Sequence, residues 1–156
     1  MIKQATADDW QQLRDVRLRA LADSPEAFLE TVEHASTFPE SRWRSRATPS
    51  DTQASFLHDD GAGMVSCFVA DDPATVFLVA MWVAGAERGT GLARDLVEQV
   101  VTWARDHGAA RVCLSVEGDN DRAARLYEKC GFVETDDPPP FPYEPRPDNR
   151  FYVREL

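Results

Sequence analysis

The sequence of 156 residues has the length of one domain, and 43% of its residues are hydrophobic, so we expect a single domain over residues 1–156 with a sizeable core. The formal net charge of −10 argues against nucleic acid as an obligate partner, because the phosphate backbone would be repelled. No apolar run is long enough for a transmembrane helix and no signal peptide is evident, so we expect a cytoplasmic protein with no membrane partner.

The first third of the chain predicts one strand and several helices. Thr6 is suited to cap the first helix, because its hydroxyl can accept a backbone N–H of the first turn. Ser24, Pro25 and Glu26 are the residue types of a second helix start. The expected elements are a strand at residues 1–5, a helix from Thr6 to about Ala22, a second helix from Ser24 to Val32, and a short helical segment from Pro39.

The middle of the chain predicts a meander of antiparallel hairpins. Short apolar runs rich in β-forming residues alternate with turn sequences that contain Asp, Gly and Pro. The expected strands cover residues 55–58, 64–70 and 75–84, with turns at residues 59–61 and 71–73.

The last part of the chain predicts helices and strands in alternation, interrupted by a proline-rich segment. Gly108 and Gly131 are placed to end the two helices. Residues 136–147 carry six of the ten prolines, and we favour their contact with a substrate or a second subunit over a plain linker. The expected elements are a helix at residues 92–107, a strand at 112–116, a helix at 121–129, and strands at 132–135 and 150–155.

Cysteine and histidine spacing disfavours both a disulfide framework and a metal centre. Cys67, Cys113 and Cys130 are odd in number and widely spaced, which fits a reducing compartment. No pair of cysteines or histidines has the spacing of a structural metal site, so we expect no metal.

The stretch Arg88-Gly89-Thr90-Gly91-Leu92-Ala93 lies between a predicted strand and a predicted helix. Such a turn exposes backbone N–H groups at the positive end of a helix dipole, and its glycines allow a ligand to approach closely. We interpret it as a pyrophosphate cradle, with an ordinary strand-to-helix turn as the alternative. A dinucleotide fingerprint would need glycine where Arg94 stands, and it would follow a parallel unit rather than hairpins.

The predicted helix at residues 121–129 is a second candidate binding element. Asn120, Ala123, Ala124 and Tyr127 share one face, because their spacing is that of successive helical turns. Two small residues between an amide and a phenol leave room for a ligand. Close packing of helix on sheet around a buried tyrosine is the alternative interpretation.

Together the two stretches resemble the GNAT superfamily of N-acetyltransferases. Arg88 to Ala93 matches its [Gln/Arg]-x-x-Gly-x-[Gly/Ala] signature, and Asn120-x-x-Ala123-x-x-Leu126-Tyr127-Glu128-Lys129-x-Gly131-Phe132 matches its second motif. The resemblance covers residues 78–132 firmly. The order of elements predicts an α+β fold, an α/β/α layered sandwich, with helices on both faces of one mixed sheet. The resemblance implies a GNAT-like, mostly antiparallel central sheet of about seven strands.

The resemblance also implies acetyl-CoA as co-substrate. Backbone N–H groups of residues 89–93 would hold the CoA pyrophosphate, with Arg88 contributing charge or loop shape. The strand end near Trp82 and Val83 would pair with the pantetheine arm, since in this family that strand separates from the next one at a bulge. The Val83 N–H would polarise the thioester carbonyl.

The second motif is expected to complete the acetyl-CoA site. Asn120 would bind the pantetheine arm or an ordered water, and Ala123 would lie beside it. Tyr127 would lie near the sulfur, and its phenol, protonated at neutral pH, would give a proton to the departing thiolate. Cys130 has no histidine partner visible in the sequence, which disfavours a covalent acetyl-enzyme.

The acceptor side is less well defined by the resemblance. Some family members carry a glutamate base where Ser115 stands here, so that base is missing, and Glu117 lies nearby on an expected loop. Glu30, Glu33 and His34 are further candidates to face the acceptor amine. A water chain to bulk solvent is the alternative route for the proton.

The implied function is an acetyl-CoA-dependent N-acetyltransferase that works by direct attack of an amine in a ternary complex. The acceptor would be a primary amine of a small molecule, a protein N-terminus or a lysine. The alternative is a catalytically silent acetyl-CoA-binding sensor or partner module. The resemblance also favours a homodimer.

Overall fold

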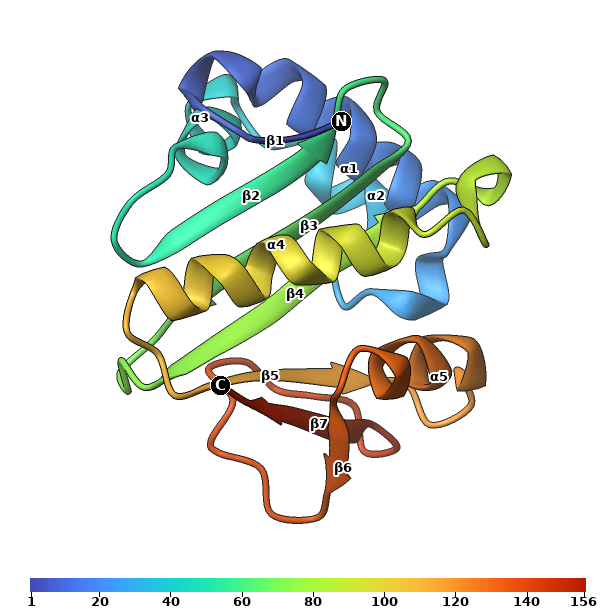
Figure 1. Ribbon diagram of the computed structural model, residues 1–156. Coiled ribbons are helices and arrows are strands. Elements are labelled where there is room, and N and C mark those ends of the chain that lie inside the picture. The colour runs from blue at the N-terminus through green and yellow to red at the C-terminus, as the bar shows by residue number, and fades with distance from the viewer.

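The structure, a computed structural model of residues 1–156, is built on one seven-stranded sheet with helices on both faces (Figure 1). The strands lie in the order β1-β2-β3-β4-β5-β7-β6, and every neighbouring pair is antiparallel except the parallel pair β4 and β5. The predicted α+β sandwich with a mixed, mostly antiparallel sheet is therefore confirmed.

The strands are β1 (Ile2–Gln4), β2 (Gln53–His58), β3 (Gly63–Val69), β4 (Thr75–Val83), β5 (Arg111–Val116), β6 (Val133–Thr135) and β7 (Arg150–Glu155). The helices are α1 (Trp10–Asp23), α2 (Val32–Ala35), α3 (Glu40–Ala47), α4 (Leu92–Asp106) and α5 (Asp121–Lys129). Three single-turn 3₁₀ helices join them: η1 (Ala7–Asp9), η2 (Pro25–Ala27) and η3 (Gly85–Glu87).

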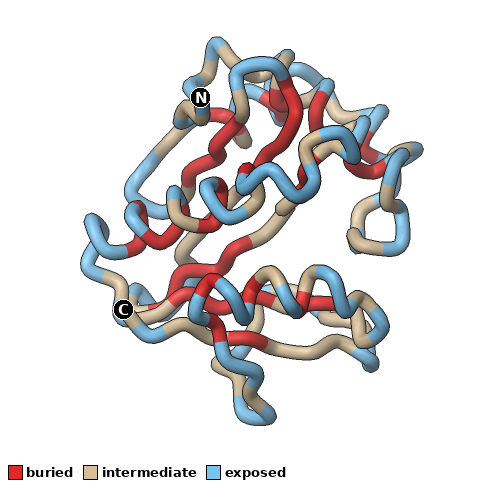
Figure 2. Tube along the Cα trace, turned by 45° about the vertical axis from the view of Figure 1, so that its right-hand side comes forward, coloured by how far each residue is buried: buried red, intermediate tan, exposed pale blue.

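The alternation of side chains along the strands divides the core between the two faces of the sheet. On β3, Val65 and Cys67 belong to the large cluster under α4 and α5, whereas Met64 belongs to the cluster under α1 and α3. Figure 2 shows buried backbone along the central strands and along the helix sides that face them. The sheet therefore presents two separately covered faces, here named the α4 face and the α1 face.

The proline-rich segment covers the α1 face where no helix lies. Phe77 is on this face, since Val76 and Leu78 on either side of it pack in the α4-face core. The Phe141 ring lies 5.0 Å from that of Phe77 and 5.1 Å from that of Phe151, centroid to centroid. The segment of residues 136–147 thus packs on the sheet through Phe141.

The expected helix from Ser24 to Val32 is wrong. Only the turn η2 forms, Phe28 is extended with φ −129° and ψ 148°, and the four-residue helix α2 begins separately at Val32. The Arg146 side chain donates hydrogen bonds to the backbone carbonyls of Glu26 and Phe28. These carbonyls bind a distant guanidinium instead of helical N–H groups, so a tertiary contact outweighs the local helix signal.

Candidate active site

Strands β4 and β5 are paired only at their amino ends. Thr75, Val76 and Phe77 pair with residues 111–113, and beyond these positions neither strand bonds to the other. We call this separation of the strand ends the splay. It leaves one edge of β4 from Leu78 onward without a neighbouring strand.

A β-bulge in β4 accompanies the splay. Met64 of β3 pairs with Trp82 and Ser66 pairs with Val79, so Ala80 and Met81 together oppose a single residue. Ala80 has φ 55°, in the left-handed region that residues other than glycine rarely adopt. The bulge redirects the backbone where the resemblance expects the thioester.

The backbone N–H of Val83 faces the splay. Ala84 donates its N–H to the carbonyl of Ala62 at 2.7 Å, so its bond runs toward β3. Successive N–H groups of a strand point to alternate sides. The Val83 N–H therefore points away from β3, to the edge that β5 has left.

The turn before α4 is open to a ligand. Gly89 and Gly91 have φ of 84° and 93°, and a Cβ added at either glycine meets no atom within 4 Å. Neither glycine donates its N–H to a backbone carbonyl, and the first helical bond runs from Asp95 to Gly91 at 3.0 Å. The N–H groups of Leu92 and Ala93, in the first turn, therefore have no helical acceptor. These donors at the positive helix end fit a phosphate group.

Arg88 and Trp82 connect this turn to the end of α1. The Asp23 carboxylate accepts a hydrogen bond from the Trp82 indole at 3.1 Å and from the Arg88 guanidinium at 3.2 Å. The bond from Trp82, joined by Ser24 and by the charge of Arg88, lowers the pKa of Asp23. The Arg88 contact thus ties this turn to the end of α1.

Asn120 caps the helix that carries Tyr127. Its side-chain oxygen accepts the N–H of Ala123 at 3.2 Å, which leaves the amide NH₂ free to donate. Ala124 is buried under the helix, and Ala123 is half-buried. The capping role of Asn120 adds to the ligand contact expected from the sequence.

Tyr127 has a buried ring and a hydroxyl with no protein partner. The residue is only 6% exposed and packs edge-on against Phe132. Its hydroxyl forms no hydrogen bond with the protein and is accessible to solvent. Burial raises the pKa of the phenol, and the charges of Cys130, Glu117 and Tyr143 raise it further. Tyr127 is therefore protonated at any physiological pH.

A polar group between β5 and the proline-rich segment includes residues that the sequence did not single out. Ser115 Oγ lies 3.3 Å from the Tyr143 hydroxyl. Glu117 follows β5 directly, its side chain is 16% exposed, and Arg146 lies 3.3 Å from its carboxylate. Burial raises the pKa of Glu117 although Arg146 opposes that shift. Tyr143 and Arg146 reach this group by packing across the sheet, for which the local sequence carries no signal.

Of the three acceptor-side candidates near α2, Glu30 alone lines the cavity under α1 and α3. Its carboxylate lies 3.2 Å from Arg17 Nε and 2.9 Å from Arg46 Nη2. Burial opposes ionisation of Glu30, but both arginines outweigh it and lower its pKa. Glu33 and His34 are exposed on α2 and do not line the cavity.

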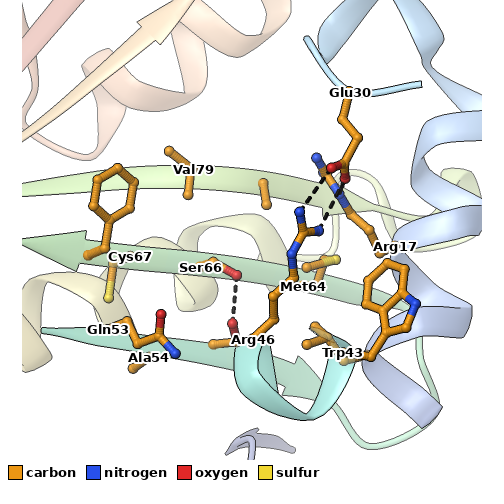
Figure 3. A pocket seen from close by; sticks show the side chains of 14 residues that line it. Arg17, Glu30, Trp43, Arg46, Gln53, Ala54, Met64, Ser66, Cys67 and Val79 are labelled. Carbon is orange, nitrogen blue, oxygen red and sulfur yellow. Dashed lines mark hydrogen bonds and ion pairs between the residues drawn. The ribbon is translucent and has the colours of Figure 1, made fainter. Parts of the chain in front are cut away.

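The cavity lies on the α1 face and reaches the bulge. Its volume is about 290 Å³. Figure 3 shows its charged side chains, with Glu30 and Arg46 pointing toward each other. The walls come from α1, the loop before α2, α3 and strands β2 to β4: Leu13, Arg17, Glu30, Trp43, Arg46, Gln53, Ala54, Ser55, Met64, Ser66, Cys67, Phe68, Val79 and Ala80.

The remaining chemically distinctive residues are the cysteines, all three free and buried. Burial raises the pKa of the Cys67 thiol to about 12 and that of Cys113 to about 11. Burial also raises the pKa of Cys130, which makes its thiol a poor nucleophile. No three metal-ligating side chains gather in one place, and no helix is long and apolar enough to cross a membrane.

Comparison with known proteins places the two motifs in context. The acetyltransferase (GNAT) family model matches residues 13–132. The chain is 36% identical over 119 residues to mycothiol acetyltransferase of Beutenbergia cavernae, a match that covers 74% of this chain and 38% of that protein. The chain therefore spans less than two fifths of that curated relative's length.

Solved structures share the fold over the whole chain. An acetyltransferase of the GNAT family from Staphylococcus aureus Mu50 has a TM-score of 0.75 at 18% identity, covering 100% of this chain and 98% of that chain. YncA from Salmonella typhimurium, solved with its cofactor acetyl-CoA, has a TM-score of 0.73 at 20% identity, covering 100% and 93%. At sequence identities this low, the structural similarity shows a shared fold alone.

Proposed function

Because this chain belongs to the acetyltransferase (GNAT) family, we propose that it transfers an acetyl group from acetyl-CoA to a primary amine. The observation that carries the proposal is that the glycine turn, the separated strand ends and the bulge follow one another along β4 and into α4. An open glycine turn lies beyond strand ends that separate at a bulge, which suits the phosphates and the extended arm of a single ligand. We also propose that residues 1–156 act as one acetyltransferase domain.

The proposed acetyl-CoA site follows β4 into α4. The N–H groups of residues 89–93 would bind the pyrophosphate, where free space lies against the glycine backbone. The backbone of Trp82 and Val83 would pair with the pantetheine arm. The Asn120 amide would donate to the same arm, with Ala123 beside it. Acetyl-CoA bound there supplies an activated acyl group.

In the proposed reaction, the amine nitrogen attacks the thioester carbon while both substrates are bound. A C–N bond forms, the C–S bond breaks, and the amine loses one proton as the thiolate gains one. The Val83 N–H would stabilise negative charge on the carbonyl oxygen. Tyr127, held protonated by its raised pKa, would give its proton to the thiolate.

We assign the role of base to Glu117. It is close enough to Tyr127 for its charge to affect the phenol, and burial raises its pKa toward the range useful for proton transfer. The arginine contacts of Glu30 lower that group's pKa and make it a weaker base. Ser115 and Tyr143 would orient the amine or a water molecule between the amine and Glu117.

Location and assembly are also part of the proposal. The three free thiols support a reducing, cytoplasmic compartment. The family resemblance supports a homodimer. The name of the Beutenbergia relative makes mycothiol-related amines one class of acceptor to test.

The test is turnover by the purified chain. Acetyl-CoA is incubated with a panel of amines (amino acids, polyamines, aminoglycosides, mycothiol-related amines and a peptide), and free thiol is measured with mass spectrometry of the products. We expect thiol release that depends on at least one amine, with an equal amount of acetylated product. Tight acetyl-CoA binding without turnover on any amine would contradict the enzyme and favour the silent sensor.

A further inference from the structure

The cavity on the α1 face has a positive charge that the mechanism above does not use. Two arginines and one glutamate line it, which leaves a surplus of one positive charge in a protein whose formal net charge is −10. The Ser55 and Ser66 hydroxyls, 2.7 Å apart, add polar groups to its wall. Such a local reversal of charge suits a small anion.

One buried nitrogen of the Arg17 guanidinium has no hydrogen-bond acceptor. Its Nε donates to Glu30 at 3.2 Å, but its Nη1 is buried without any partner, the one buried side-chain nitrogen or oxygen in the chain that lacks one. The guanidinium stacks on Phe28, with its carbon 4.7 Å from the ring centroid. Because an unpaired buried donor is costly, a fixed guanidinium of this kind is suited to an acceptor from outside.

The second arginine completes a fixed frame. Arg46 binds both oxygens of Glu30, at 3.2 and 2.9 Å, and its guanidinium lies over the rings of Phe38 and Trp43. Glu30 is thus held between the two arginines and neutralises only one of their charges. A planar guanidinium matches a carboxylate in shape as well as charge.

The position of the cavity connects it to acetyl transfer. Val79 and Ala80, at the bulge, form part of its wall, and the arginines form another part. Its volume of about 290 Å³ lies at the small end of ligand pockets. A compact molecule could place its amine at the bulge and its anion at Arg17. A polyamine or aminoglycoside would bring further positive charge to the arginines.

We propose that this cavity binds the carboxylate of the acceptor, so that the acceptor is a small amine carrying a carboxylate, of amino-acid size. The inference rests on the proposed acetyl transfer for the role of its ligand. A purely structural role for the same ion pairs, holding residues 28–30 against α1 and α3, predicts no ligand preference.

Binding can be measured apart from turnover. The full chain saturated with CoA is titrated calorimetrically with N-acetylglycine, N-acetylalanine and N-acetylleucine, and with the matching N-acetyl amides. We expect at least one acid to bind about tenfold or more tightly than its amide, since the charge-assisted contact is lost in the amide. If no acid binds, or if acids and amides bind alike, the carboxylate site is refuted.

Substitutions at Arg17 and at Glu30 should change the affinity for acids in opposite directions. Arg17→Gln should remove the preference for acids, and Arg17→Lys should restore part of it. Glu30→Gln should tighten acid binding, because it removes the internal competitor for both arginines, whereas a structural pair predicts only a loss of stability. Arg44→Gln, at an exposed position on α3, the helix that carries Arg46, is the control and should change nothing. Weaker acid binding by Glu30→Gln would overturn the proposal even if Arg17→Gln fails to fold.

Turnover separates this inference from the proposed function. Selective binding of acids without turnover on any amine would contradict acetyl transfer and leave the carboxylate site standing. Equal turnover on amino acids and on their amides would contradict the carboxylate site and leave acetyl transfer standing.

Discussion

Tyr127 combines a packed ring with a hydroxyl that reaches solvent. Its ring is packed in the core against Phe132, yet its hydroxyl has no protein partner. A hydroxyl that reaches solvent and has no protein partner is free to contact a bound ligand. The raised pKa keeps the proton available for the leaving thiolate.

Replacing Tyr127 with Phe should lower kcat by about 10²-fold, the size of a general-acid contribution, while acetyl-CoA affinity stays nearly unchanged. The phenyl ring keeps the packing and loses only the hydroxyl. Steady-state rates combined with calorimetric titration of acetyl-CoA measure the two effects separately. Wild-type turnover in this variant would show that Tyr127 is not the acid.

The pH profile reports on Glu117. Only the ionised carboxylate can accept the proton of the amine, so kcat/KM should fall as the pH drops through the pKa of Glu117. Because that pKa is raised by burial, the fall should begin at higher pH than for an ordinary glutamate. Glu117→Gln should lower the rate about 10²-fold and remove this acidic limb.

The control for Glu117 is Glu128→Gln, an exposed glutamate on α5 with no role in the proposal. It should keep both the rate and the pH profile of the parent. An unchanged acidic limb in Glu117→Gln would assign the base to another group or to a water chain.

For single residues, the sequence predicts a candidate role where residues close together in the chain fix the geometry. The glycines before α4 and the Asn120 to Tyr127 face are visible because a turn or a helix fixes their geometry locally. Glu117 becomes a buried base candidate only when the proline-rich segment brings Arg146 against it, 29 residues away in sequence. The Arg17 to Glu30 contact is likewise a product of tertiary folding.

Among the elements, the turn into α4 contains two glycines at positive φ, Gly89 and Gly91. Gly91 is the residue before the helix and has φ 93° with open space beside it. The space is available to a phosphate only while no side chain occupies it. The length of α4 and its aligned peptide dipoles make this end of the helix positive.

Replacing Gly91 with Val should weaken acetyl-CoA binding by at least about tenfold, through backbone strain at positive φ and a branched side chain in the phosphate path. Gly108→Val is the matched control, since Gly108 has φ 76° at the opposite end of α4, also with open space. Both variants should lose stability, but only Gly91→Val should lose affinity in a calorimetric titration. Equal affinity losses would remove the cradle hypothesis.

The elements also show where prediction from sequence succeeds and fails. The hairpin strands and α4 are predicted because each has a strong apolar pattern that only one packing satisfies. The expected helix from Ser24 fails because its carbonyls bind Arg146, a residue that local signals cannot reveal. The aromatic packing of Phe141 on the sheet has the same long-range origin.

In the whole molecule, the two proposed substrates lie on opposite faces of the sheet. The elements proposed to bind acetyl-CoA include α4 and α5, which share one core, whereas the arginine-lined cavity lies under α1 and α3 on the opposite face. The splay, visible in Figure 1 as the separation of β4 from β5, and the bulge in β4 lie in the sheet between these two faces. An acceptor could therefore meet the thioester without either substrate leaving first.

This arrangement makes direct transfer the central claim, and two-substrate kinetics test it most directly. Initial rates are measured while acetyl-CoA and the best amine of the panel are both varied, and the intact protein is weighed after incubation with acetyl-CoA alone. We expect intersecting double-reciprocal lines and no acetylated protein, since Cys130 is buried with a raised pKa. Parallel lines together with a stable acetyl-enzyme would contradict direct attack in a ternary complex.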